Sequence, residues 1–388
     1  MRILFTTFVS PGHLRPMVPL AWALRSLGHE VLVTCPPNQV RYPLSAGLCT
    51  VPYGEDIEPI PAMRNRMPEG IASPAELHHG RASQERYRRV GAAIGRVAAN
   101  GAQEVVDFAR RWKPDVIVHE PMEMTGRVAA AVLGVPSVLH RWGLETLTTF
   151  TEGAVESLGG VCERLRIEPE ALTSTWVIDP TPASMVLPGT RPGWPIQYVP
   201  DNGSAVVPDW TLDPPARPRV CVTVGNLMLE LGGMPALRAM FDALGRFDVE
   251  VVAAVRIPEG EHIGGERPNV RVEALPIGLF MGSCDLVIHH GGTGSSFTTV
   301  MHGLPQLVVP QLADEFEYGE AVTARGVGRF LETPDQQRDA DAIADAVADL
   351  LGDQRYRKEA RALREECEAL PTPWQVAQDL VTAVRDRT

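Results

Sequence analysis

The chain has 388 residues, of which 44% are hydrophobic and 22% are charged. This length gives room for two domains of ordinary size, each with its own core. The formal net charge of −12 argues against nucleic acid as a partner, because binding to a phosphate backbone needs a basic face. A phosphate-bearing ligand would therefore have to be held by local donors.

Cysteine usage and hydropathy indicate a cytoplasmic protein with no membrane partner. The six cysteines form no CxxC pair and no cluster with the spacing of metal ligands, so we expect buried, reduced thiols. The first ten residues, MRILFTTFVS, are typical of neither a signal peptide nor a membrane span. No run of about eighteen apolar residues occurs elsewhere.

Strands and helices alternate through the first half, which predicts a parallel, doubly wound sheet. The predicted strands are 2–7, 29–35, 48–52, 115–119 and 136–140. The predicted helices are about 14–27 and 76–112, with a third after Glu120 that closes with residues 129–133. Residues 54–75 carry proline and methionine without a regular period, which favours a surface loop that contacts an apolar ligand. Residues 188–218 contain eight prolines and are expected to link the domains.

The second half repeats the pattern and predicts a second doubly wound domain. Its predicted strands are 219–224, 249–255, 270–273, 285–288, 306–310 and 327–331, and its predicted helices are 234–246, 294–302, 316–325, 339–351 and 354–369. We therefore expect an α/β protein with an N-terminal domain (1–205), a C-terminal domain (206–370) and a final helix (371–388) that packs back on the first domain. The carboxyl ends of both sheets would face each other across one cleft.

Residues 284–303, CDLVIHHGGTGSSFTTVMHG, combine a buried strand, a glycine turn and a helix start. Glycines let backbone N–H groups approach a phosphate, and a helix N-terminus adds roughly half a positive charge. The pattern predicts a diphosphate site in which His289 is the ligand and His290 is structural. A turn that only closes an α/β unit is the alternative.

Two residues at strand ends of the first domain could form a catalytic pair. His13 follows the first strand, where an imidazole can act as a general base near neutral pH, although a helix cap or a structural histidine is the alternative. Glu120 follows the strand 115–119 and could accept a hydrogen bond from one ring nitrogen of His13. Glu123 competes for that role, but a glutamate favoured by the dipole of the following helix is the better interpretation.

Carboxylates in the second half have two interpretations. Asp314 and Glu315 could bind vicinal hydroxyls of a sugar or could cap the helix that follows. Asp339 and Asp341 resemble a metal-binding pair but begin an amphipathic helix, so we expect capping rather than a metal. The turn from Val224 to Asn226 offers backbone and amide donors to a phosphate.

Two long motifs together resemble a known family. Residues 11–31, PGHLRPMVPLAWALRSLGHEV, and residues 287–322, VIHHGGTGSSFTTVMHGLPQLVVPQLADEFEYGEAV, are similar to the inverting GT-B glycosyltransferases that use nucleoside-diphosphate sugars. The phrase VPDNGSAVVPDW and the HHGG signature resemble the actinomycete natural-product branch, which moves deoxysugars from TDP-sugars onto polyketide aglycones. The resemblance implies two Rossmann-like domains and catalysis without a metal or other cofactor.

The resemblance also implies roles for particular residues. His13 matches the general base and Glu120 its acidic partner. The implied donor-binding residues are Gly225, Asn226, Leu275, His289, Gly292, Thr293, Gly294, Asp314 and Glu315. A large apolar acceptor is implied, with candidate contacts at Phe8, Met63, Met67, Met122, Met124, Trp142 and Phe150, and with Glu145 as an outside candidate. The alternative for several of the apolar candidates is a place in the core.

Three departures from the family pattern bear on the donor. Ala274 replaces a tryptophan that stacks on the nucleotide base, and Glu315 replaces the glutamine of glucosyl-transferring relatives. Phe297 replaces a glutamate that reaches the ribose, which favours TDP over UDP. The sugar, the aglycone, a homodimer and an auxiliary activator protein all stay open.

Two other functions are compatible with parts of the pattern. Gly292 and Gly294, with Asp314 twenty residues further on, partly match the fingerprint of a nicotinamide-dependent dehydrogenase. Phe297 stands where that fingerprint needs its third glycine, which counts against this alternative. A non-catalytic auxiliary protein that binds sugar nucleotides would not need the pair formed by His13 and Glu120.

Overall fold

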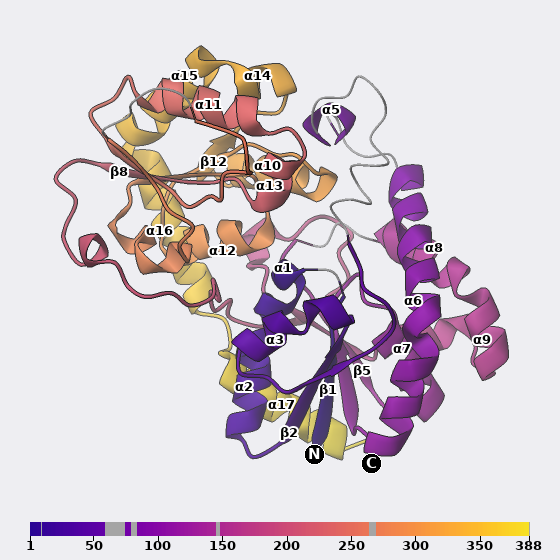
Figure 1. Ribbon diagram of the computed structural model, residues 1–388. Coiled ribbons are helices and arrows are strands. Elements are labelled where there is room, and N and C mark those ends of the chain that lie inside the picture. Colours follow the sequence, from indigo (N-terminus) through magenta and orange to yellow (C-terminus); the bar gives the residue numbers. More distant parts are fainter. Residues whose placement is uncertain (9, 59–73, 79–83, 145–147, 264–268, 388) are drawn as a thin grey trace. The chain divides into compact units, whose positions relative to one another are not determined.

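The computed structural model describes residues 1–8, 10–58, 74–78, 84–144, 148–263 and 269–387. The chain divides into two compact units (Figure 1). Unit 1 comprises Met1–Ile57, Ser83–Asp201 and Ala369–Thr388, and unit 2 comprises Glu58–Ala82 and Asn202–Glu368. Each unit is built on one parallel sheet with helices on both faces.

The sheet of unit 1 has seven strands in the order β3-β2-β1-β4-β5-β6-β7, and all its pairings are parallel. The strands are β1 (Arg2–Thr6), β2 (Glu30–Cys35), β3 (Thr50–Pro52), β4 (Val116–His119), β5 (Ser137–His140), β6 (Trp176–Asp179) and β7 (Trp194–Pro195). The strand order reverses between β1 and β4, and in such sheets ligands bind outside the carboxyl ends of the strands at this point.

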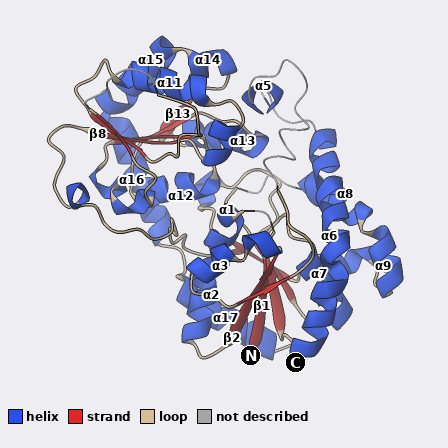
Figure 2. Cartoon of the chain, in the orientation of Figure 1, coloured by secondary structure: helices blue, strands red, loops and turns tan. Residues whose placement is uncertain are grey.

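Helices cover both faces of the unit 1 sheet (Figures 1 and 2). The α-helices are α1 (Pro11–Leu14), α2 (Val18–Ser26), α3 (Arg41–Ser45), α6 (Gln84–Trp112), α7 (Thr125–Leu133), α8 (Thr148–Ser157), α9 (Gly159–Leu165) and α17 (Pro373–Arg385). The short 3-10 helices are η1 (Arg15–Met17), η2 (Pro37–Gln39), η3 (Pro169–Leu172) and η4 (Ala183–Met185). On one face α2 and α17 pack together, and on the other α6 packs against α7 and α8.

The last helix, α17, is part of the core of unit 1. Its buried residues Val376, Leu380 and Val384 lie in one apolar cluster with residues of β1 and α2. The capping box formed by Thr372 and Gln375 begins this helix. The chain therefore leaves unit 1, forms most of unit 2, and returns to complete unit 1.

The sheet of unit 2 has six parallel strands in the order β10-β9-β8-β11-β12-β13. The strands are β8 (Arg219–Thr223), β9 (Glu250–Ala253), β10 (Val270–Val272), β11 (Leu286–His289), β12 (Gln306–Val308) and β13 (Gly328–Phe330). This order, 3-2-1-4-5-6 within the unit, is that of a Rossmann-like sheet. The strand order of this sheet reverses between β8 and β11, and we call the place of such a reversal in either sheet its switch point.

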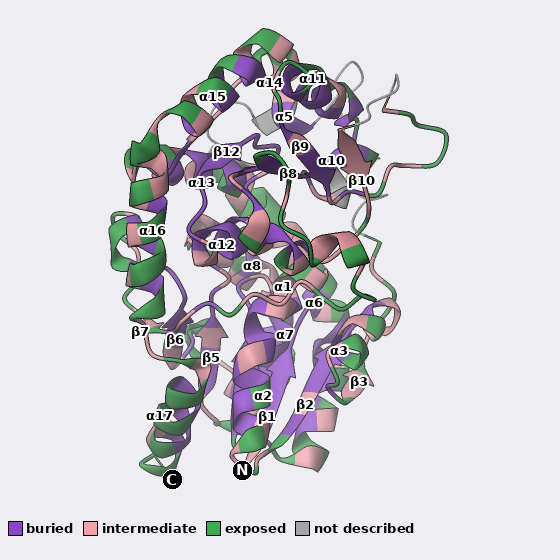
Figure 3. Ribbon diagram, turned by 90° about the vertical axis from the view of Figure 1, so that its left-hand side faces the viewer, coloured by how far each residue is buried: buried purple, intermediate pink, exposed green. Residues whose placement is uncertain are grey.

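The helices of unit 2 complete the same architecture. The α-helices are α5 (Pro74–His78), α10 (Asn226–Glu230), α11 (Met234–Leu244), α12 (Thr293–Met301), α13 (Ala313–Ala324), α14 (Pro334–Arg338), α15 (Ala340–Gly352) and α16 (Gln354–Glu368). The 3-10 helices are η5 (Asp209–Thr211), η6 (Ile277–Leu279) and η7 (Met281–Ser283). The central strands β8, β11 and β12 are buried, whereas α15 and α16 expose their outer faces (Figure 3).

The predicted fold class is confirmed, and several local predictions need correction. The expected helix 76–112 is divided into α5 and α6, which are separated by residues outside the described part of the chain. Most of the expected loop 54–75 also lies outside it. The expected linker contains β7, and the sequence analysis missed β6, α8, α9, α10 and α14.

Candidate active site

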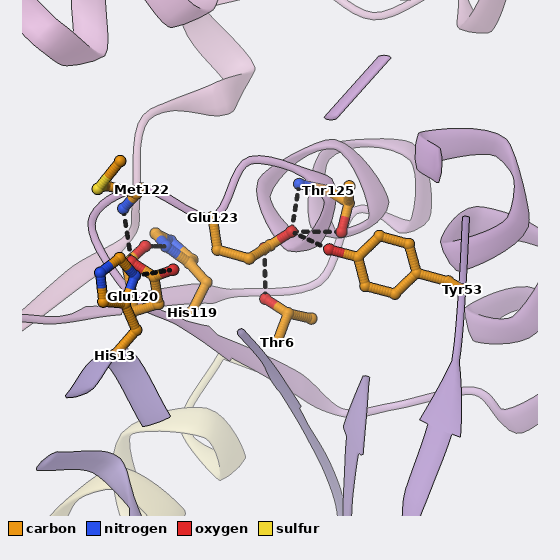
Figure 4. Close-up of polar contacts among 8 residues, drawn as sticks. All are labelled: Thr6, His13, Tyr53, His119, Glu120, Met122, Glu123 and Thr125. Atoms are coloured by element: carbon orange, nitrogen blue, oxygen red, sulfur yellow. Dashed lines mark hydrogen bonds and ion pairs between the residues drawn. The ribbon is translucent and has the colours of Figure 1, made fainter. Parts of the chain in front are cut away.

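His13 and Glu120 lie together at the switch point of unit 1. The Nδ1 atom of His13 is 3.2 Å from Oε1 of Glu120, so the structure forms the contact expected from the sequence (Figure 4). The His13 side chain is 18% exposed, whereas the Glu120 side chain is fully buried. If Nδ1–H donates to the carboxylate, Nε2 of His13 is left free to accept a proton.

The carboxylate of Glu120 is held from a second side. The backbone N–H of Met122 donates to Oε2 at 2.6 Å, so each carboxylate oxygen of Glu120 has its own donor. A carboxylate fixed in this way holds the imidazole in one tautomer and stabilises its positive charge when it gains a proton. The pair therefore has the geometry of a general base with its acidic partner.

Trp142 packs against the ring of His13. The ring centroids are 4.1 Å apart and the planes are inclined by 40°. An indole ring this close to an imidazole restricts the rotation of the imidazole. Trp142 therefore contacts the candidate base itself, in addition to its expected role beside an acceptor.

The other candidate acceptor contacts have mixed outcomes. Met124 is fully buried in an apolar cluster with residues of α6 and α7, so its assignment to the acceptor wall is wrong. Phe8 and Phe150 are also buried, and Met122 is half-buried. Three further candidates lie outside the described residues: Met63, Met67 and Glu145.

In unit 2, the start of α12 lies directly after the carboxyl end of β11. Gly292 is the N-cap residue, and Gly292, Thr293 and Gly294 are all partly exposed. The first N–H groups of a helix have no partner within it, and the helix dipole favours an anion there. These three residues therefore keep their predicted place as donors to a phosphate.

The prediction that His289 binds the diphosphate is wrong. Its side chain is fully buried, Nε2 lies 2.9 Å from Oε1 of Gln306, and Nδ1 accepts the N–H of Gly291 at 3.0 Å. Both ring nitrogens are therefore occupied inside the protein. Burial lowers the pKa of His289 to about 3, so the ring is neutral at neutral pH.

His290, and not His289, has its ring beside Gly292 at the start of α12, where the sequence analysis expected the diphosphate. Its side chain is 20% exposed, and its Nδ1 lies 3.4 Å from the carbonyl oxygen of Thr223. The ring lies so close to Gly292 that a Cβ atom on that glycine would be 2.3 Å from Nε2. Burial lowers the pKa of His290 to about 4, so an anion bound beside this ring would favour its protonation.

The two carboxylates at the start of α13 separate into two roles. Oε2 of Glu315 accepts the backbone N–H groups of Gln311 and Leu312 at 2.7 and 2.8 Å, which caps the helix. The Glu315 side chain is buried, so the capping alternative explains this residue and its assignment to sugar binding is wrong. Asp314 is exposed, and its role in sugar binding stays a prediction.

The remaining donor candidates lie at strand ends of unit 2. Gly225 has a positive φ of 69°, and a Cβ atom there would lie 3.0 Å from the ring of His290. Asn226 begins α10, and Leu275 is half-buried against an apolar cluster. Phe297 is fully buried beside Tyr318, so its identity carries no information about the ribose.

The described residues contain no group of three or more His, Cys, Asp or Glu side chains that could hold a metal ion. Asp339 instead accepts the N–H of Asp341 as the cap of α15, as expected. No helix in the described part of the chain is long and apolar enough to cross a membrane.

Two Rossmann-like units, one with a paired histidine and carboxylate and the other with a glycine-rich helix start, define a GT-B glycosyltransferase. The solved structure of spinosyn rhamnosyltransferase SpnG in complex with thymidine diphosphate is 31% identical, with a TM-score of 0.83 over 98% of this chain and 100% of that one. This assignment removes the dehydrogenase alternative.

The chain belongs to the family of erythromycin biosynthesis protein CIII-like glycosyltransferases. Residues 22–225 match the N-terminal domain of that family and residues 238–383 its C-terminal domain. The chain is 35% identical to L-demethylnoviosyl transferase of Streptomyces niveus, over 100% of both chains. It is 33% identical to 10-deoxymethynolide desosaminyltransferase of Streptomyces venezuelae, over 98% of this chain and 96% of the relative.

Proposed function

We propose that the protein is an inverting, metal-independent glycosyltransferase that moves a deoxysugar from a TDP-sugar to a large apolar aglycone, such as an aromatic polyketide or a macrolide. The observation that carries the chemistry is the 3.2 Å contact between His13 and Glu120. A protein that only binds sugar nucleotides needs no such base. The relatives' names, which include a desosaminyltransferase and a complex with thymidine diphosphate, support the choice of donor.

In the proposed reaction, the acceptor hydroxyl lies beside Nε2 of His13. This nitrogen takes the hydroxyl proton as the oxygen attacks the anomeric carbon of the sugar, and the bond from that carbon to the diphosphate breaks. A single displacement inverts the configuration at the anomeric carbon. Glu120 stabilises the imidazolium that forms, at a contact already made before the reaction.

The leaving TDP needs stabilisation of its negative charge. In the proposal this comes from the N–H groups at the start of α12, between Gly292 and Gly294, and from the ring of His290. These donors act electrostatically where other transferases use a metal ion. Unit 1 therefore binds the acceptor and unit 2 binds the donor.

The nucleotide preference can be tested without knowing the sugar or the aglycone. Thermal unfolding is measured with TDP, UDP and NAD at equal concentrations. A ligand at a hundred times its Kd stabilises the folded state by about 2.7 kcal/mol, so TDP should raise the unfolding temperature by several degrees. A larger shift with UDP would contradict the choice of donor, and stabilisation by NAD alone would contradict the transferase assignment.

The role of His13 is tested by TDP release from TDP-deoxysugars with a panel of polyketide aglycones. His13→Ala should lower kcat by about 10²- to 10⁴-fold, the usual contribution of a general base, without changing the Kd of TDP. Normal turnover by a folded His13→Ala protein would refute the assignment. Repeating the assay across protein concentrations, and with added activator protein, decides whether a homodimer or an auxiliary protein belongs to the reaction.

A further inference from the structure

Glu123 is a buried carboxylate of unit 1 that has no part in the proposed reaction. Glu123 lies in the turn between β4 and α7, three residues after Glu120, and its side chain is fully buried. Burying a carboxylate costs several kcal/mol unless hydrogen bonds replace its water. Burial also raises the pKa of Glu123, and the hydrogen bonds that it accepts oppose that rise.

Donors from three elements of unit 1 surround the Glu123 carboxylate (Figure 4). From the start of α7, the N–H groups of Thr125 and Gly126 each donate at 2.8 Å, and the Thr125 hydroxyl donates as well. From the end of β1, the Thr6 hydroxyl donates at 2.5 Å, and after β3 the Tyr53 hydroxyl donates at 3.3 Å. Five donors therefore satisfy one carboxylate.

This set of donors exceeds what a helix start requires. A serine, threonine or aspartate cap satisfies the first N–H groups of a helix with a shorter side chain. Glu123 accepts the first N–H groups of α7 and also accepts two hydroxyls from the sheet, those of Thr6 at the end of β1 and Tyr53 after β3. The space around it is closed, since a Cβ atom on Gly126 would lie 2.3 Å from Oγ1 of Thr6 and 2.9 Å from Oε2 of Glu123.

Glu123 links β1 to the turn after β4, and His13 and Glu120 follow these same two strands. Thr6 is the last residue of β1, and the connection that follows it leads to His13. Glu120 follows β4, and its carbonyl oxygen accepts the N–H of Glu123 at 3.2 Å. The hydrogen bond between Thr6 and Glu123 therefore connects the segment that bears the base to the turn that bears its partner.

His119 also contacts the backbone of this turn, at the carbonyl oxygen of Glu120. His119 is fully buried; its Nδ1 lies 3.2 Å from the carbonyl oxygen of Glu120, and its Nε2 lies 2.9 Å from the Ser174 hydroxyl. Burial lowers the pKa of His119 well below its usual value, so the ring is neutral. The backbone of Glu120 is thus held between His119 and Glu123.

We propose that Glu123 is a positioning residue, which sets the contact between His13 and Glu120 by joining the end of β1 to the turn between β4 and α7. This proposal rests on the proposed function, in which His13 is the base. The carboxylate does not touch the reacting atoms, and it acts through the hydroxyl of Thr6. Misplacement of a reacting group by about 1 Å can lower the rate on the order of a hundredfold. A contact that holds His13 and Glu120 in place therefore affects kcat.

Two variants separate positioning from stability. Thr6→Val and Tyr53→Phe each remove one hydroxyl from the same carboxylate, but only Thr6 lies on the strand that leads to His13. Thr6→Val should lower kcat by about 10- to 100-fold with an unchanged KM for the TDP-sugar, and Thr6→Ser should restore it. Tyr53→Phe should lower the unfolding temperature and leave kcat within about twofold.

A spectroscopic measurement tests the same point without any turnover. The ¹⁵N shifts of the neutral His13 ring report which nitrogen carries the proton. The wild-type protein should show the single tautomer with its proton on Nδ1, whereas Thr6→Val should show a mixture. This result does not depend on which reaction the protein catalyses, so it can fail separately from the proposed function.

The proposal is overturned if Thr6→Val keeps the wild-type tautomer and kcat, or if Tyr53→Phe lowers kcat as much as Thr6→Val does. Should Thr6→Val not fold, Thr6→Ala removes the same hydroxyl with a smaller side chain. Glu123→Gln is the third variant, because its amide cannot accept from all five donors. It should lower kcat at least as far as Thr6→Val, and wild-type kcat would also overturn the proposal.

Discussion

Gly292→Ala tests the corrected assignment of the diphosphate ligand. The added Cβ atom would lie 2.3 Å from Nε2 of His290 and 3.0 and 3.1 Å from two of its ring carbons. The backbone of Gly292, with φ −61° and ψ 137°, is acceptable for alanine. The ring of His290 must therefore move, while the chain itself is not strained.

The expected magnitude follows from the one contact that is lost. A hydrogen bond to a charged group contributes about 1.5–3 kcal/mol, so Gly292→Ala should raise the Kd of TDP by roughly 10- to 150-fold. His290→Ala should raise it by the same factor. If the alanine acts only through the histidine, the double variant should bind TDP no more weakly than His290→Ala alone.

The assay is isothermal titration of TDP into the four proteins of this cycle. Gly352→Ala is the matched control, because a Cβ atom there meets open space. Additive effects in the double variant would refute the reasoning, since they would mean that the added methyl group blocks the phosphate directly. Wild-type affinity in Gly292→Ala would refute it as well.

The remaining predictions concern stability. With folded-state pKa values of about 3 and 4, His289 and His290 are neutral in the folded protein and gain protons on unfolding below about pH 6.5. Their contribution to the stability of unit 2 is present above that pH and is lost as the pH falls toward 4, by up to about 2.7 kcal/mol per pH unit; urea unfolding at pH 5 and 6 measures the pH slope of the free energy of unfolding, and His289→Gln should lower that slope by up to about 1.4 kcal/mol per pH unit. Gly91→Ala would place a Cβ atom 1.9 Å from a carbonyl oxygen of α8, whereas the Cβ atom of Gly160→Ala meets open space. The unfolding temperature of Gly91→Ala should therefore fall far more than that of Gly160→Ala, and equal shifts would contradict the close packing of α6 and α8. Leu380→Ala, in the core of unit 1, should cost about 2–5 kcal/mol in urea unfolding, and a loss below 1 kcal/mol would contradict the core role of α17.

The two sheets could be predicted from the sequence because their central strands are continuous apolar runs between helical segments. The edge strand β7 could not be predicted, since it has two residues, Trp194 and Pro195, within a proline-rich segment. It exists through its pairing with β6, where Ile178 aligns with Trp194. A strand formed by long-range pairing leaves no local signal of its own.

The contact between His13 and Glu120 could be predicted because both residues follow strands that are central to the sheet. The ligand of the diphosphate could not be decided between His289 and His290, which are adjacent at the end of a strand buried on both faces. The deciding contact is with Gln306, seventeen residues away on the neighbouring strand. The sequence reasoning likewise identified Glu123 at a helix start but could not find its contact with Thr6, which depends on the pairing of β1 with β4.

The return of the chain to unit 1 at α17 affects how the protein can be made and recombined. Synthesis has to reach α17 before the apolar face beside α2 can be covered, whereas the strands of unit 2 are made earlier. A chimaera that exchanges unit 1 between relatives therefore needs a crossover point near Glu368 in addition to the one near Asp201. With a single crossover, the new first half would meet a foreign α17 in its core, and a substrate change would be confounded with a packing defect.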